Sequence, residues 1–304
     1  MQYMAKDKSI YSCIFFAIAF LIYGTYIYYD YKNQGNWWRE DFGKKKQDEI
    51  AKVLPNALLL GGSNLVYSLS ASQLSDLTEY SWYNLGLSSE AFNDRNYWDF
   101  VSSTLNDKQR LDVELVVYSG INFLSVGHTS SRSNDTSDAW GNRKLSWLPN
   151  APLALRFKNI LTGVNAFRGY PLPITRGDFD FDKMNCDPNY QEAFEREMDW
   201  EQIQSWLDSQ VSIISEKFSN AAVVIVIPSE FYGKMYDRNI DKSYAMKLQS
   251  FIELKYGSNV SFLAQPPYKE KSMTCDARHH ANSVGRVWRT DNLVKFLESQ
   301  INYK

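Results

Sequence analysis

Short apolar runs that end in turn residues place the strongest constraint on the fold of this chain. Three of them cover 57–60, 113–118 and 221–227, and a weaker one covers 260–263. Runs of this length, with little polar alternation, are typical of strands that are buried on both faces, as in a parallel sheet. The first run leads into Gly61-Gly62, which indicates a tight turn directly after that strand.

Amphipathic helical patterns separate these runs. Between 190 and 218 most apolar residues recur at three- and four-residue steps, and a last pattern of this kind lies at 287–301. Strands that alternate with helices predict a parallel sheet covered on both faces. Ligands of such sheets bind beyond the carboxyl ends of the strands. We therefore expect the functional residues directly after the apolar runs.

Ser63 is the first candidate for chemistry, because it follows the first strand and its two glycines. Glycines allow a sharp bend and a close approach of the backbone to a ligand. A serine at a strand-to-helix turn presents its hydroxyl at a helix N-terminus, where free N–H groups stabilise an oxyanion. The alternative is structural, since serine is also a preferred N-cap residue.

The chain has only three histidines, and two of them, His279 and His280, follow Asp276 shortly before the last helix. A carboxylate can orient an imidazole as a base, and a serine hydroxyl needs such a base to become a useful nucleophile. A surface Asp-His pair with a capping role is the alternative. The motifs of P-loop proteins, dinucleotide-binding proteins, zinc proteases and α/β-hydrolases are absent from the sequence.

Two intermediate turns offer groups that suit an oxyanion hole. Gly86 offers a backbone N–H, and Asn122, in Gly120-Ile121-Asn122, offers a side-chain amide. Glycine and asparagine are ordinary turn residues, so each signal is weak alone.

The order of these elements resembles the SGNH/GDSL hydrolase superfamily, and the matching positions extend from 58 to 297. The resemblance implies a three-layer α/β/α domain without a metal or an organic cofactor. It implies that Ser63 is the nucleophile and that the Ser63 and Gly86 amides and the Asn122 side chain form the oxyanion hole. It also implies an Asp-His pair as the base.

The sequence departs from the family pattern at two places and is ambiguous at a third. Gly62 precedes the serine where the GDSL signature has Asp, and Phe123 follows Asn122 where many members have Asp. His280-Ala281-Asn282, followed by Gly285, is similar to the family's continuation after its histidine. We therefore expect His280 to be the base and Asp276 its partner, with His279 as the reserve base.

The N-terminal segment is expected to cross a membrane. Residues 10–29 contain no charge, and about 20 apolar residues are needed to span a bilayer. We predict a tail at 1–9, an uncleaved signal anchor at 10–29, a juxtamembrane linker at 30–50 and the catalytic domain at 51–304. A cleaved signal peptide is the rival interpretation, which the length of the apolar run and the lack of a cleavage site disfavour.

Two further features leave alternatives open. The segment 123–187 is rich in Ser, Asn, Gly, Pro and Trp, and it is either a cap over the site or a peripheral subdomain. Cys186 and Cys275 either form one disulfide in an oxidising compartment or remain two buried thiols.

The resulting functional hypothesis is serine-dependent acyl transfer, with O-acetyl as the expected group, to or from a cell-envelope glycan. One N-terminal span before such a domain is similar to envelope acylation proteins, which implies a multi-span membrane partner as acyl donor and a domain outside the cytoplasm. A net charge of -2 with 22% charged residues gives no indication of nucleic-acid binding. A water-using esterase and a non-catalytic scaffolding protein are the alternatives.

Overall fold

The computed structural model divides the chain into two compact units, residues 1–44 and 45–304. It describes residues 16, 18–21, 23–24, 43–87, 94–120, 173–179, 186, 200–227, 231, 238–266, 268–275 and 279–301. In the first unit, Phe16, Ile18, Phe20 and Leu21 are exposed. None of the helices in the described part of the chain is both long and apolar enough to cross a membrane. Most of the span predicted at 10–29 lies outside the described residues.

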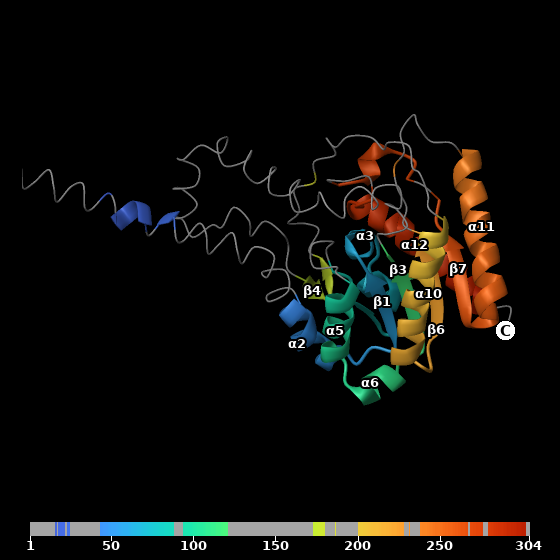
Figure 1. The fold of residues 1–304 in the computed structure, drawn as a ribbon, viewed down its shortest axis with the longest axis horizontal. Helices are drawn as coiled ribbons and strands as arrows, with labels where there is room; N and C mark the ends of the chain where they lie inside the picture. The colour runs from blue at the N-terminus through green and yellow to red at the C-terminus, as the bar shows by residue number, and fades with distance from the viewer. Residues whose placement is uncertain are drawn as a thin grey trace, which may run out of the picture. The chain divides into compact units, whose positions relative to one another are not determined.

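The second unit is built on a five-stranded sheet in the order β2-β1-β3-β6-β7. All neighbouring strands pair in parallel, as predicted from the apolar runs. The strands are β1 (Ala57–Gly61), β2 (Trp82–Asn84), β3 (Leu115–Ser119), β6 (Ala222–Ile227) and β7 (Val260–Ala264). Their parallel direction brings all their carboxyl ends to one edge, shown in Figure 1.

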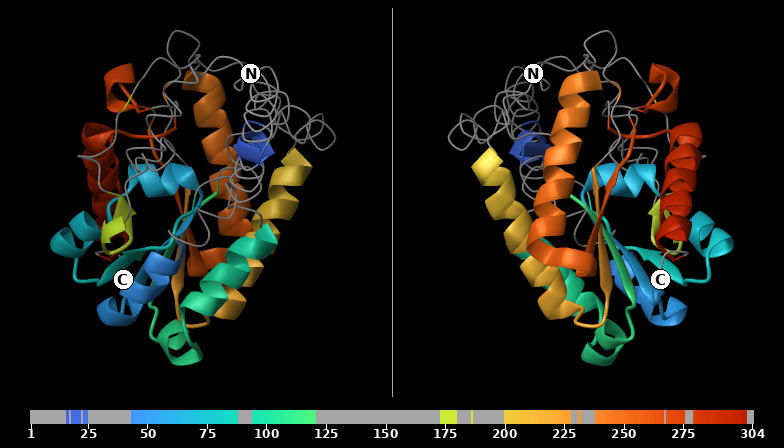
Figure 2. Two further views of the ribbon diagram at one scale, coloured as in Figure 1. Left: turned by 90° about the vertical axis from the view of Figure 1, so that its left-hand side faces the viewer. Right: turned by 90° about the vertical axis from the view of Figure 1, so that its right-hand side faces the viewer.

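Helices cover both faces of this sheet, which gives the predicted three layers (Figure 2). Leu59, Val117 and Val224 lie in register and pack in one apolar cluster with Leu74 of α4 (Ala71–Leu77) and Leu293 of α12 (Ser283–Ile301). Side chains of successive strand residues point to opposite faces. The other face is covered by α5 (Asp94–Thr104) and α10 (Trp200–Lys217).

The helical patterns of the sequence correspond to two of the long helices. The pattern at 190–218 contains α10, and the last pattern falls within α12. A third long helix, α11 (Arg238–Tyr256), was not predicted. It lies beside β7 and buries Leu248 and Ile252. Its neighbouring apolar residues Met246 and Leu254 remain exposed, which weakens the periodic signal.

The folded unit begins earlier than the predicted linker boundary at residue 50. Residues 44–53 form α2 (Lys44–Val53), and the side chains of Lys46 and Ile50 are fully buried. The segment predicted to be a linker thus supplies a buried lysine of the domain. Hydrophobic patterning places a lysine at the surface, because burial of its ammonium is costly unless other segments supply hydrogen-bond acceptors.

The described part of the 123–187 segment includes a small hairpin of β4 (Pro173–Thr175) and β5 (Asp178–Phe179). The backbone N–H of Asn84, in edge strand β2, donates to Arg176 O at 2.9 Å. Buried Asp178 accepts hydrogen bonds from the Ala71 and Ser72 amides, both at 2.9 Å, at the start of α4. This hairpin therefore lies along the edge of the sheet. The rest of the proposed cap, apart from Cys186, lies outside the described residues.

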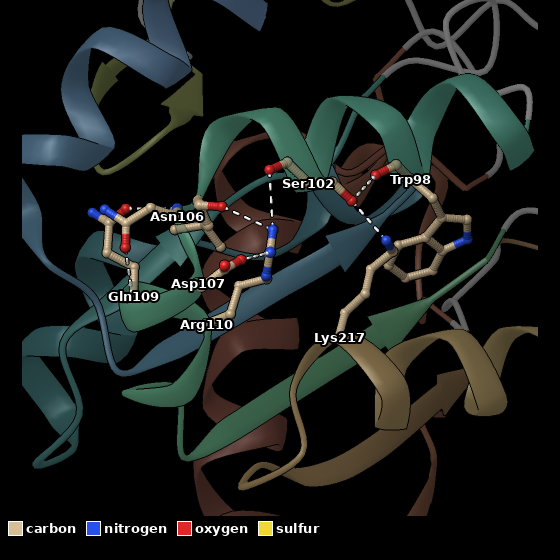
Figure 3. A network of polar contacts seen from close by, with 8 residues as sticks. Trp98, Ser102, Asn106, Asp107, Gln109, Arg110 and Lys217 are labelled. Carbon is tan, nitrogen blue, oxygen red and sulfur yellow. Dashed lines mark hydrogen bonds and ion pairs between the residues drawn. The ribbon is translucent and has the colours of Figure 1, made fainter.

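A polar network joins α5, α6 (Asp107–Leu111) and α10 (Figure 3). Lys217 Nζ donates to Ser102 Oγ at 2.6 Å, and Arg110 Nη1 donates to Ser102 O at 3.1 Å. Asn106 and Gln109 form a capping box at the start of α6. Since α6 leads into β3, this network holds the helices near the amino end of that strand, away from Ser63.

Candidate active site

Ser63 is the first residue of α3 (Ser63–Ser68), directly beyond the carboxyl end of β1. Gly61 has a φ of 152°, and a Cβ atom there would lie 2.1 Å from Ser119 O. Only glycine therefore lets the first strand approach β3 this closely. The Leu65 and Val66 amides both donate to Gly62 O, at 3.0 and 3.2 Å. The turn predicted from Gly61-Gly62 thus starts a helix at the serine.

The structure brings His280 to Ser63 across 217 positions of the chain, with His280 Nε2 2.9 Å from Ser63 Oγ. Ser63 is only 3% exposed, whereas His280 is partly exposed. When Nε2 is the acceptor, the serine hydroxyl donates and Nδ1 carries the imidazole proton. This is the geometry that a general base requires toward a serine nucleophile.

Contacts from both sides hold the loop that carries His280. The Cys275 amide donates to His280 O at 2.7 Å, and Thr274 pairs with Ala281 in an isolated antiparallel bridge. The imidazole stacks on Tyr67, with ring centroids 4.1 Å apart and an interplanar angle of 9°. These contacts restrict both the backbone and the ring orientation of His280.

His279 lies next to His280 but is held differently. Its backbone carbonyl accepts a hydrogen bond from Ser68 Oγ at 3.2 Å, and its ring meets the His280 ring edge-on at a centroid distance of 4.3 Å. Of the two adjacent histidines, His280 is the one that contacts the Ser63 hydroxyl. The geometry therefore favours His280 over His279 as the base.

Two predicted site residues, Asp276 and Asn122, lie outside the described residues. Their roles, as partner of the His280 imidazole and as oxyanion donor, stay predictions. Cys275, which precedes Asp276, is fully buried and forms a disulfide with Cys186. The start of the loop that leads to His280 is thus covalently linked to a segment 89 positions away in the chain.

Gly86 lies in the turn after β2, where its amide already has a hydrogen-bond partner. Gly86 N donates to Asn84 Oδ1 at 3.0 Å, while the amides of Leu85 and Leu87 donate to Leu59 O and Gly61 O. For Gly86 to serve as the predicted oxyanion donor, it must first release the Asn84 side chain. The turn lies beside the end of β1, since the Leu87 amide donates to Gly61 O at 3.0 Å.

Buried Lys46 holds this turn in place from α2. Its Nζ donates to Asn84 O at 2.6 Å and to Gly86 O at 2.9 Å. Burial lowers the pKa of Lys46 to about 7, against the opposing effect of Asp178 and Glu49. A lysine in a basic run carries no sequence signal for this role, so it was missed.

Tyr97 supports the end of β1 from α5. Its hydroxyl accepts a hydrogen bond from Gly61 N at 2.9 Å and donates to Leu85 O at 3.4 Å. Burial raises the pKa of Tyr97 far above its usual value, so the phenol stays neutral and can fill both roles. It thereby connects the serine turn to the Gly86 turn.

Tyr67 and Arg289 are two further residues near the site that sequence reasoning did not assign. Tyr67 follows Ser63 by one helical turn, so both side chains lie on the same face of α3. This spacing could have predicted that Tyr67 contacts a residue that binds Ser63. Arg289 lies within α12 and is fully buried. Its position gave no signal, because an arginine in an amphipathic helix is normally solvated.

Comparison with known proteins gives distant structural similarities. No protein-family model matches the sequence, and no curated protein matches it. A family two carbohydrate esterase from Clostridium thermocellum, solved with cellohexaose, has a TM-score of 0.43 at 10% identity over 82% of this chain. The acetyl xylan esterase Est2A from Butyrivibrio proteoclasticus has a TM-score of 0.41 at 10% identity over 81%. The chain spans 65% and 64% of these two structures, less than two thirds of their length. Similarities this weak do not assign an activity.

Proposed function

We propose that this chain is a serine-dependent acyl-transfer enzyme of the SGNH/GDSL type. The observation that carries the proposal is the 2.9 Å contact between Ser63 Oγ and His280 Nε2. It joins a serine at the first position of a helix to a histidine in a loop whose backbone is held on both sides. A serine that only capped α3 would have no need of an imidazole at hydrogen-bond distance.

The proposed reaction forms and then breaks an acyl-serine. His280 Nε2 takes the proton of Ser63 as Oγ attacks the carbonyl carbon of an ester. The Ser63 amide, the Asn122 side chain and, after it releases Asn84, the Gly86 amide stabilise the oxyanion. The C–O bond to the leaving alcohol then breaks, and His280 returns the proton to that alcohol. A second hydroxyl attacks the acyl-serine: water in an esterase, a sugar hydroxyl in a transferase.

We propose an O-acetyl group of a cell-envelope glycan as the substrate class and residues 10–29 as the membrane anchor. The uncharged run of this segment and the exposure of Phe16, Phe20 and Leu21 support the anchor. The Cys186–Cys275 disulfide supports a catalytic domain in an oxidising compartment outside the cytoplasm. In a transferase, the acyl group would come from a multi-span membrane partner.

The test uses the full chain in detergent with p-nitrophenyl acetate and with a fluorophosphonate that labels activated serines. We expect ester turnover and a phosphonylated peptide that contains Ser63. Both signals should disappear in Ser63→Ala and fall at least about 10²-fold in His280→Ala, the usual contribution of a general base. His279→Ala is the matched control, because it removes the neighbouring ring that does not contact Ser63.

The outcomes separate the candidate functions. Equal turnover in the wild type and Ser63→Ala, without labelling of Ser63, would leave the scaffolding alternative in place. Loss in His279→Ala with retention in His280→Ala would reassign the base. If Ser63 is labelled, a soluble oligosaccharide added with the acetyl ester distinguishes the two enzymes. Acetylated sugar identifies a transferase, and free acetate alone identifies an esterase.

A further inference from the structure

Arg289 occupies an unusual position for an arginine, with its side chain fully buried inside the domain. It projects from α12, the helix that directly follows the loop of His280. Burial of a charged guanidinium costs several kcal/mol unless hydrogen bonds and charge offset it. Burial also lowers the pKa of Arg289, although arginine keeps its charge at neutral pH. Because burial of the Arg289 guanidinium is costly, we expect the contacts of this side chain to serve a specific role.

The guanidinium contacts the two segments that meet at the proposed nucleophile. Its Nη1 donates to the carbonyl of Asn64, the residue after Ser63, at 2.8 Å. Its Nη2 donates to Oγ of Ser119, the last residue of β3, at 3.4 Å. The side chain of Asn64 donates to the same Ser119 Oγ at 2.8 Å. The turn of Ser63 and the end of β3 are thus joined through Arg289.

Gln265 holds the guanidinium itself in place. Arg289 Nε donates to Gln265 Oε1, and Gln265 Nε2 donates back to Arg289 O at 3.1 Å. The hydrogen-bond acceptors that these residues provide are a carbonyl, a hydroxyl and an amide, all of them neutral. Tyr268 also interacts with the guanidinium and, against the effect of burial, raises its pKa.

We propose that Arg289 is a positioning residue for Ser63, an inference that rests on the proposed function. The guanidinium links α12 to the first turn of α3, so it sets the serine turn relative to the helix that follows His280. It also fastens the end of β3, which leads toward Asn122. Small errors in such a geometry reduce the rate of attack strongly. The buried positive charge further favours the negative charge that develops as Ser63 attacks.

The test measures how fast a fluorophosphonate modifies Ser63 in the full chain, resolved into the rate at saturation and the binding constant. We expect Arg289→Met to lower the saturating rate about 10²-fold, comparable to other losses of transition-state stabilisation, with the binding constant within about 3-fold. Arg289→Lys keeps the positive charge but loses the planar guanidinium with its several N–H donors. Its rate should therefore lie between those of the wild type and Arg289→Met. A purely structural role would lower thermal stability without this order of rates.

Two further variants make the test independent of folding. Ser119→Ala removes the hydroxyl that accepts from both Asn64 and Arg289, and we expect about a 10-fold lower rate from this smaller change. Thr290→Ala is the matched control, because Thr290 is equally buried on α12 but contacts Ser70 and Arg286 instead. Its rate should equal that of the wild type. If Arg289→Met does not fold, the rates of Arg289→Lys and Ser119→Ala decide whether Arg289 positions Ser63.

The failures of the two proposals differ. Absence of Ser63 labelling in the wild type overturns the proposed function and this inference with it. Wild-type rates in folded Arg289→Met, or in both Arg289→Lys and Ser119→Ala, overturn this inference alone. A loss in Thr290→Ala as large as that in Arg289→Met would also overturn it, since any buried change in α12 would then have the same effect.

Discussion

At the scale of single residues, Ser63 and His280 depend on neighbours that lie close in space but are ordinary in sequence. Tyr67 stacks on the imidazole one helical turn after the serine. Lys46 binds the Gly86 turn, and Tyr97 joins that turn to the end of β1. Each contributes a hydrogen bond or a ring contact beside Ser63 or His280.

Tyr67 provides a residue-scale prediction. Tyr67→Leu removes the ring on which His280 stacks, so the imidazole can rotate away from Ser63. We expect about a 10-fold lower rate of Ser63 phosphonylation, since an aromatic contact contributes up to about 1.5 kcal/mol and about 1.4 kcal/mol corresponds to a factor of ten. Tyr67→Phe keeps the stacked ring and should stay within about 3-fold of the wild type. Equal losses in both variants would show that the hydroxyl matters and the stack does not.

At the scale of elements, α2 and the β4–β5 hairpin enclose the edge of the sheet beside the Gly86 turn. Glu49 of α2 accepts from the Arg176 and Gly177 amides of the hairpin, at 2.7 and 3.1 Å. Lys46 of the same helix binds the carbonyls of Asn84 and Gly86. Helix α2 is thereby part of the support for the Gly86 turn.

Lys46 makes the stability of this element depend on pH. Its folded-state pKa of about 7 lies below the usual 10.5, so between these values the unfolded chain binds more protons. The free energy of unfolding therefore rises with pH in this range, by about 2 kcal/mol from pH 7 to 9 for this group.

Urea unfolding of the full chain, compared with Lys46→Met, measures this contribution. The difference in unfolding free energy between the two proteins should shift in favour of the wild type as the pH rises. Lys45→Met is the control, because Lys45 is exposed on the same helix and should leave the wild-type pH dependence unchanged. A difference that is independent of pH would show that Lys46 has an ordinary pKa.

At the scale of the whole second unit, the Cys186–Cys275 disulfide joins segments that are 89 positions apart. A crosslink of this separation removes conformational entropy from the unfolded chain, which stabilises the fold by about 4 kcal/mol. Because Cys275 N also donates to His280 O, the crosslink lies close to the proposed base.

Reduction of the disulfide should lower both the midpoint of thermal unfolding and the rate of Ser63 phosphonylation. Intact mass after alkylation establishes how many thiols the reductant has released. The double variant Cys186→Ser/Cys275→Ser should match the reduced protein and should not respond to reductant. Unchanged unfolding of a fully reduced wild type would contradict a stabilising role of the crosslink.

The sequence by itself determined the features that depend on local patterns. The apolar runs identified β1, β3 and β6, because a strand buried on both faces needs apolar side chains at successive positions. The weaker run identified β7, an edge strand that is only partly buried. Helical periodicity located α10 and α12, and Gly61-Gly62 located the turn before Ser63. The same logic failed for α11 and for the start of α2, whose exposed apolar and buried charged residues break the pattern.

Only the tertiary structure decided which side chains act together. The preference for His280 over His279 rests on its contact with Ser63 Oγ, which a ring stack on Tyr67 and backbone pairing between Thr274 and Ala281 support. The bond from Gly86 N to Asn84 Oδ1, which bears on the predicted oxyanion hole, was equally invisible in the sequence. So were the buried charges of Lys46 and Arg289, because the groups that make their burial tolerable come from other elements. Contacts of this kind depend on how elements pack, and no local pattern encodes them.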